Sequence, residues 1–298
     1  MEFIWTVYMK KLFSLLIVML ILVSVCGCAK QESVQIAPTT LPVYEFTSRI
    51  CEDTGLSVGR LVTESVSCLH DYSLQVSQMR KIEAAELVVI SGAGLEDFLG
   101  SALDGKDYID SSADVHIHEA GDQHNDENHG HSHDADPHIW LSSENAKVMS
   151  ENIFHGLCLR YPEHKEAFTR NLTQLHSQLD ALQTYGEENL KDLSCRQIIT
   201  FHDGFGYFAE SFDLTILEAV EEESGSEASA KEIIHLAQLI REHKLSSLFI
   251  ERSGSDACAN ILAAETGANI YTLDMAMAGD SYFDAMYHNI DTIKEALK

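Results

Sequence analysis

The sequence predicts an α/β protein made of two small lobes, each built on a parallel sheet. Two observations carry this prediction. Short apolar runs alternate with helical patterns in both halves of the chain, and a long amphipathic helix is expected between the halves. The chain has 298 residues, of which 45% are hydrophobic, so it can bury two modest cores. Wholesale disorder is therefore excluded.

The N-terminus has the pattern of a secretory signal. Lys10 and Lys11 precede an apolar run from Leu12 to Val23, and small residues surround Cys28. The run is shorter than the roughly 20 residues of a membrane-spanning helix. A cysteine directly after small residues resembles a bacterial lipoprotein box. On that resemblance residues 1–27 are a lipoprotein signal peptide, Cys28 is lipidated and becomes the first mature residue, and residues 28–40 are a tether.

The first predicted lobe spans residues 41–160. Buried strands are expected at 61–66 and 86–91, and helices at 43–54 and 77–85. The second lobe, residues 193–298, repeats the same alternation. Its expected strands are 197–201, 214–220, 247–251 and 269–273, with helices at 229–243 and 256–266.

Residues 161–192 are predicted to form a linking helix. An apolar stripe recurs at spacings of four and three residues, at Phe168, Leu172, Leu175, Leu179 and Leu182. Pro162 lies near the expected start and Gly186 near the expected end. A helix of about 24 residues would be roughly 36 Å long, enough to join both lobes. The stripe alone is equally consistent with an ordinary core helix.

A segment rich in histidine and acid, residues 114–135, interrupts the first lobe. It has almost no apolar residues, so we expect a mobile loop that cannot bury a core. Its histidines are His116, His118, His124, His129, His131 and His133. Such a composition is typical of metal-binding tracts, because neutral imidazole is a good ligand for zinc, copper and nickel. The alternative is a merely solvated acidic loop.

The charge balance is strongly acidic. The chain carries 47 Asp and Glu against 20 Lys and Arg, a formal net charge of −27. Nonspecific attraction to nucleic acid requires clustered cations. Nucleic acid is therefore excluded as a partner, and a soluble cation is favoured by sign.

Four potential metal ligands follow predicted strands or the His-rich loop. His70 follows the strand expected at 61–66, His202 follows 197–201, and Asp280 follows 269–273. His138 lies just beyond the far end of the loop. Ligands in α/β proteins bind beyond the carboxyl ends of strands. The joint placement of these four residues therefore predicts a metal site.

Several motifs in the chain resemble those of the zinc and manganese solute-binding lipoproteins of bacterial ABC importers. They are His70-Asp71-Tyr72, Gly92-Ala93-Gly94-Leu95-Glu96, Asp136-Pro137-His138-Ile139-Trp140-Leu141, Glu144-Asn145-Ala146, the run from Phe201 to Phe208 and Gly279-Asp280-Ser281-Tyr282. The resemblance implies two α/β lobes joined by one rigid helix, with the metal in the cleft between them. It also implies the ligands His70, His138, His202 and Asp280. The expected protein is a monomer, held at the cell membrane through Cys28 and serving an ABC transporter permease.

Zinc is the expected cargo. Three imidazoles and one carboxylate suit tetrahedral zinc, whereas manganese prefers more oxygen ligands. By the resemblance, the manganese branch has a glutamate where this chain has His202, and the His-rich loop marks the zinc branch. A manganese receptor of the same family stays open as an alternative.

Two other classes of function also stay open. A metal-buffering or adhesin lipoprotein would need the loop but not the cleft. A zinc hydrolase would need an open coordination position and a nearby carboxylate base, but His-Glu-x-x-His and any recognisable nucleophile motif are absent from the sequence. We therefore expect no enzymatic activity.

Overall fold

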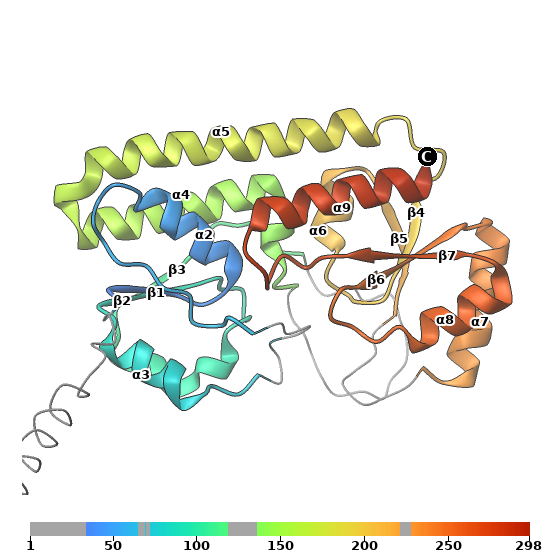
Figure 1. The fold of residues 1–298 in the computed structure, drawn as a ribbon, viewed down its shortest axis with the longest axis horizontal. Helices are drawn as coiled ribbons and strands as arrows, with labels where there is room; N and C mark the ends of the chain where they lie inside the picture. Colours follow the sequence, from blue (N-terminus) through green and yellow to red (C-terminus); the bar gives the residue numbers. More distant parts are fainter. Residues whose placement is uncertain (1–33, 65–68, 70–71, 119–135, 221–227) are drawn as a thin grey trace, which may run out of the picture. The chain divides into compact units, whose positions relative to one another are not determined.

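The computed structural model describes residues 34–64, 69, 72–118, 136–220 and 228–298 (Figure 1). The predicted signal peptide, Cys28, His70 and four loop histidines, His124, His129, His131 and His133, lie outside the described residues. No helix within the described ranges is both long and apolar enough to cross a membrane.

The first sheet has three parallel strands in the order β1-β2-β3. They are β1 (Ile36–Pro38), β2 (Leu87–Ile90) and β3 (Tyr108–Asp110). All four residues of β2 are apolar and buried, as expected for a central parallel strand with both faces covered. Helices α2 (Leu41–Ile50) and α4 (Ser143–Arg160) cover one face, and α3 (Val76–Ala84) lies on the other (Figure 1).

The second sheet has four parallel strands in the order β5-β4-β6-β7. The strands are β4 (Gln197–Thr200), β5 (Thr215–Ala219), β6 (Ser247–Glu251) and β7 (Asn269–Leu273). The helices of this lobe are α6 (Gly206–Ser211), α7 (Ala230–His243), α8 (Ala257–Thr266) and α9 (Tyr282–Leu297). Helices α7 and α8 pack together on the side of the sheet away from α9 (Figure 1).

Helix α5 (Lys165–Leu190) joins the two lobes. It contacts α2 and α4 of the first lobe and α9 of the second. The predicted stripe faces this core: four of its residues are buried and Leu172 is partly buried. The helix does not end at Gly186 but continues to Leu190. Glycine is required at position 186 because the ring of Phe212 packs against it. A Cβ there would lie 2.1 Å from Cε1 of Phe212. The predicted fold class of two parallel-sheet lobes and one long helix is confirmed.

Two local predictions need correction. The strand expected at 61–66 is irregular over its described part, 61–64. There Leu61 and Val62 donate backbone hydrogen bonds to the carbonyls of Pro38 and Thr39, just where β1 ends. Conversely, Ile36–Pro38 lies within the segment expected to be a tether but forms β1, which is fully buried. A strand of three residues is too short to produce a recognisable pattern.

Candidate metal site

His138 and His202 meet at the boundary between the lobes. His202 follows β4 by two residues, and His138 immediately precedes the short helix η2 (Ile139–Leu141). Their Nε2 atoms are 3.3 Å apart, and the two rings are nearly perpendicular, at 85°. Two nitrogens about 2.0–2.1 Å from one tetrahedral zinc would lie ~3.3–3.4 Å apart. The two Nε2 atoms therefore have the spacing of two ligands of one metal ion.

Asp136 fixes the orientation of His138. Its Oδ1 accepts the backbone N–H of His138 at 2.9 Å and lies 2.8 Å from Nδ1 of the same residue. The His138 side chain is buried, at 5% exposure. A carboxylate on Nδ1 favours the tautomer with its proton there and leaves Nε2 as an electron-pair donor.

Glu251 lies against the other nitrogen of His202. Its Oε2 is 3.5 Å from Nδ1 of His202, and its side chain is 4% exposed at the end of β6. Burial, followed by the negative charge of Asp274, raises the pKa of Glu251 to about 8. Asp274 is itself paired with Arg252, at 3.3 Å. The carboxyl of Glu251 is therefore placed to orient His202 from the side of Nδ1.

Gly204 allows the chain to pass close to both imidazoles. A Cβ at this position would lie 2.7 Å from Cδ2 of His202, 2.9 Å from Nδ1 of His138 and 2.6 Å from the methyl carbon of Met275. Real side chains essentially never approach so closely. Any larger residue would have to displace one of the two rings.

Asp280 is not grouped with these two histidines. It is exposed, and within the described ranges no three His, Cys, Asp or Glu side chains are grouped so that they could hold a metal. Its loop is held from the first lobe, because Nη1 of Arg60 donates to the carbonyl of Gly279 at 2.9 Å. A cavity of about 70 Å³ lies between this loop and β6, lined by Glu251, Arg252, Ser253, Asp274, Met275, Met277, Ala278 and Gly279.

Of the loop histidines, His116 and His118 are described. Their rings are 5.6 Å apart. Nε2 of His118 lies 2.7 Å from Oε2 of Glu210, and its ring stacks on Tyr207 with centroids 4.0 Å apart. His118 therefore contacts α6 of the second lobe.

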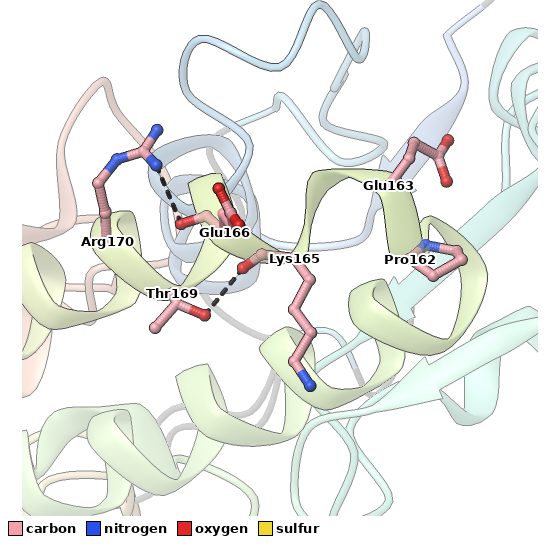
Figure 2. Close-up of a pocket in the computed structure, with 6 residues that line it drawn as sticks. All are labelled: Pro162, Glu163, Lys165, Glu166, Thr169 and Arg170. Atoms are coloured by element: carbon pink, nitrogen blue, oxygen red, sulfur yellow. Dashed lines mark hydrogen bonds between the residues drawn. The ribbon is translucent and has the colours of Figure 1, made fainter.

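A larger cavity, of about 630 Å³, lies where η3 (Pro162–His164) meets α5. Neither His138 nor His202 lines it. It is lined by Pro162, Glu163, Lys165, Glu166, Thr169 and Arg170, and their side chains point in different directions (Figure 2). Arg170 and Thr169 donate to carbonyls of the same helix, those of Glu166 and Lys165. No His or Cys lines this cavity, so it does not resemble a metal site.

Sequence reasoning missed the groups that surround the two imidazoles. Asp136 was available as a signal, because it stands two residues before His138 in a quoted motif. Glu251 was also detectable in principle, as a carboxylate at the end of a predicted strand. Tyr207 lies in the motif run from Phe201 to Phe208, but nothing in that run indicated its role. Glu210 gave no signal, because only the fold brings α6 beside the ends of the His-rich segment.

The fold and the histidine pair define a metal-binding protein of the two-lobed, solute-binding type. The family model described as "Zinc-uptake complex component A periplasmic" matches residues 36–296, and the chain belongs to this family.

Individual relatives agree with this membership. A "Putative metal-binding protein" of Treponema pallidum is 30% identical over 240 residues, covering 76% of each chain. The "Zinc-binding lipoprotein AdcA" of Streptococcus pneumoniae is 28% identical over 308 residues, 96% of this chain but 61% of that protein. A crystal structure of ZnuA superposes with a TM-score of 0.77 at 26% identity, covering 90% of this chain and 100% of that one.

Proposed function

We propose that this chain is an extracytoplasmic, high-affinity zinc receptor that captures Zn²⁺ and delivers it to an ABC importer permease. The single observation that carries the proposal is the 3.3 Å separation of the Nε2 atoms of His138 and His202, each ring having a carboxyl group near its other nitrogen. His70 and Asp280 are the proposed further ligands. They are supported by the motifs that contain them and by the family to which the chain belongs.

Zinc is favoured over manganese by the nature of the ligands. Imidazole suits zinc, and a site of three imidazoles and one carboxylate offers fewer oxygens than manganese prefers. The AdcA relative is named a zinc-binding lipoprotein. Because zinc also outcompetes manganese at most such sites, metal content of the protein isolated from its own cells is a necessary complement to titration.

The experiment is zinc titration of the mature protein against a competing chelator. We expect one tight site in the wild type, and a loss of affinity of at least about tenfold in His138→Ala and in His202→Ala. His155→Ala is the matched control, because His155 is exposed on α4. Wild-type affinity in both site variants, with their folds intact, would defeat the assignment.

The proposed receptor is anchored through Cys28, acts as a monomer and transfers its metal to a permease. Support comes from the sequence around Cys28 and from the lipoprotein name of the AdcA relative. Labelled palmitate should enter the wild-type protein and not Cys28→Ser. Label in both proteins, or in neither, would exclude lipidation at Cys28.

Zinc stoichiometry separates this proposal from its alternatives. A metal-buffering or adhesin lipoprotein would lose most of its capacity with residues 119–135 and little with His202→Ala. The proposed receptor would show the opposite pattern for its tight site. The family is one of metal-uptake components rather than of enzymes, and we propose that the chain has no hydrolase activity. Zinc-dependent turnover of an ester or peptide substrate, lost in His202→Ala, would contradict this.

A further inference from the structure

Tyr207 of α6 lies where the two described ends of the His-rich segment meet. The backbone N–H of His118 donates to its hydroxyl oxygen at 2.9 Å, and the hydroxyl donates to the carbonyl of Asp136, also at 2.9 Å. The N–H of Asp136 in turn donates to the carbonyl of His118 at 3.1 Å. These three hydrogen bonds form a closed ring, which we call the Tyr207 junction.

The junction uses the full ability of a phenol to hydrogen-bond in both directions. A tyrosine hydroxyl has one proton to donate and lone pairs to accept, and here it does both at once. Tyr207 is 1% exposed, and burial raises its pKa to about 12, so the hydroxyl keeps its proton at neutral pH. Phenylalanine would fill the same space but could neither accept from His118 nor donate to Asp136.

The side chain of His118 adds a second attachment to α6. Its ring lies over Tyr207 with an interplanar angle of 14°, and Nε2 is 2.7 Å from the carboxylate of Glu210, one helical turn further along. The entry of the His-rich segment is therefore held by a backbone hydrogen bond, a stacked ring and a side-chain hydrogen bond.

The exit of the segment leads directly to the candidate metal ligand. Asp136, whose carbonyl accepts from Tyr207, also holds both the backbone N–H and Nδ1 of His138 with its Oδ1. A displacement of the backbone just before Asp136 would also displace His138, because Asp136 holds it. The hydrogen bond from Tyr207 to the Asp136 carbonyl opposes such a displacement.

We propose that Tyr207 is a positioning residue for His138. It hydrogen-bonds His118 and Asp136, the residues that flank the segment 119–135, and so keeps Asp136 in the position from which it orients the imidazole of His138. This inference rests on the proposed zinc-binding function. It assigns Tyr207 no contact with the metal. His118 acts in it as part of the attachment to α6 rather than as a loop ligand.

The first test needs no metal. Hydrogen exchange of the zinc-free protein should be faster at the amides of His118, Asp136 and His138 in Tyr207→Phe than in the wild type, by roughly fivefold to tenfold for the loss of such hydrogen bonds. Tyr185→Phe is the matched control. It removes a hydroxyl that bonds Asp291 on the surface, at 2.7 Å, and should leave these three amides unchanged. Unchanged exchange in Tyr207→Phe would overturn the proposal.

The second test asks whether Tyr207 acts by fastening the ends. In one variant, Asn-Gly replaces residues 119–135. A two-residue hairpin turn should then keep the hydrogen bond from the Asp136 amide to the His118 carbonyl. Zinc affinity is then measured for the wild type, Tyr207→Phe, the Asn-Gly variant and the combined variant. We expect Tyr207→Phe to weaken the tight site about tenfold in the full chain and less than about threefold in the Asn-Gly background, where the covalent turn replaces the junction.

Equal losses in the two backgrounds would overturn the proposal, because Tyr207 would then act only through packing. Failure of the wild type to bind zinc would instead defeat the proposed function, and the exchange measurement would still decide whether the junction exists. Unfolding of each variant by far-ultraviolet circular dichroism identifies any that fail to fold. If Tyr207→Phe fails to fold, two variants of Glu210 replace it in the exchange measurement. Glu210→Gln keeps an acceptor for His118 and Glu210→Ala does not, so comparing them tests the second attachment.

Discussion

His138 and His202, the two candidate ligands that the structure describes as a pair, each have a carboxyl group near Nδ1. This arrangement defines the chemistry of the site. Asp136 reaches His138 at 2.8 Å, and Glu251 approaches His202 at 3.5 Å. A carboxylate behind a histidine fixes its tautomer and raises its basicity as a ligand. Burial raises the pKa of Glu251 to about 8, so Glu251 has this effect on His202 only in its ionised form. The two Nε2 atoms lie 3.3 Å apart, the spacing of two ligands of one cation.

At the residue scale, we predict that Glu251→Ala lowers zinc affinity by about 10–100-fold. The reason is that His202 would lose the carboxyl group beside its Nδ1, and with it one constraint on the tautomer and rotamer of the ring. Glu251→Gln should cost less, because the amide oxygen can still accept from Nδ1–H. Affinities would be measured by chelator competition at pH 8.5, above the raised pKa of Glu251.

Asp274→Asn is the matched control for Glu251. Asp274 lines the same cavity and its charge acts on Glu251, but it pairs with Arg252 rather than with an imidazole. We expect a much smaller effect from this change. If Asp274→Asn weakened zinc binding as much as Glu251→Ala, general negative charge in the cavity, and not orientation of His202, would be the cause.

At the scale of elements, the loop after β2 is organised around a buried carboxyl group. Glu96 accepts from the hydroxyl of Thr39 and the amide of Ser91 through Oε1, and from the amide of Gly92 through Oε2. Gly92 has φ of +84°, a conformation that favours glycine. Glu96 thus joins the carboxyl ends of β1 and β2, where parallel α/β sheets place their sites.

The buried state of Glu96 predicts a pH dependence of stability. Burial raises its pKa from 4.5 to about 7, although the three hydrogen bonds lower it. Between pH 4.5 and about 7, the carboxyl group of Glu96 is ionised in the unfolded chain but protonated in the folded chain. The stabilising contribution is therefore complete below pH 4.5 and is lost as pH rises through 7, by roughly 3 kcal/mol. The free energy of unfolding of the wild type minus that of Glu96→Gln, from urea unfolding at each pH, should follow this slope, because Glu251, whose pKa is also raised, contributes to both proteins.

Glu163→Gln is the control, because Glu163 is an exposed acidic residue in the short helix η3, just before α5. It should leave the slope unchanged. A wild type that gains stability relative to Glu96→Gln as pH rises would contradict the prediction. The hydrogen bonds from Thr39, Ser91 and Gly92 would then outweigh burial and keep the carboxylate ionised.

The regular elements were largely predictable from their sequence patterns. The strands 247–251 and 269–273 have the predicted bounds, because each is an apolar run flanked by turn residues. Helix α7 begins one residue after its predicted start, at the Ser229 and Glu232 capping box. In contrast, β1 and β3 have three residues each. Their strand character depends on pairing with β2, which no local pattern encodes.

The candidate site was predictable only in part. His138 and His202 could be selected because they lie beyond strands or in recognisable motifs. Of the two carboxyl groups beside them, Asp136 could be selected from its motif, whereas Glu251 could be found only as one of several acidic residues near strand ends. A glutamate at a strand end, such as Glu251, has the same local sequence whether it faces an imidazole or water. The role of Tyr207 depends on contacts that span many residues, to His118 and to Asp136. His70 lies outside the described residues, and its role stays a proposal.

At the scale of the whole described chain, the lobes are joined by several contacts, among them those of Arg60 with Gly279 and of His118 with α6. Two further connections involve more residues. One is α5, which packs on helices of both. The other is a hydrogen-bonded chain beside the candidate site. Trp140 donates through its indole N–H to the carbonyl of Met275 at 2.7 Å, and the hydroxyl of Tyr282 donates to the carbonyl of Trp140 at 2.7 Å. The amide of Tyr282 also donates to the carboxylate of Glu45 on α2. Segments that carry His138 and Asp280 are therefore linked directly, and one apolar cluster includes residues of both lobes.

This double connection predicts that both lobes unfold in one transition. The two tryptophans are Trp5 and Trp140, so protein that starts at Cys28 reports by fluorescence on Trp140 alone, whereas circular dichroism reports on all helices. Urea curves from the two probes should coincide. Tyr282→Phe keeps the ring against Phe46 but leaves the buried carbonyl of Trp140 without this donor. It should lower the free energy of unfolding by about 1–3 kcal/mol with both curves shifting together. A fluorescence transition at lower urea than the dichroism transition, in the wild type, would mean that the interface beside His138 opens before the lobes unfold.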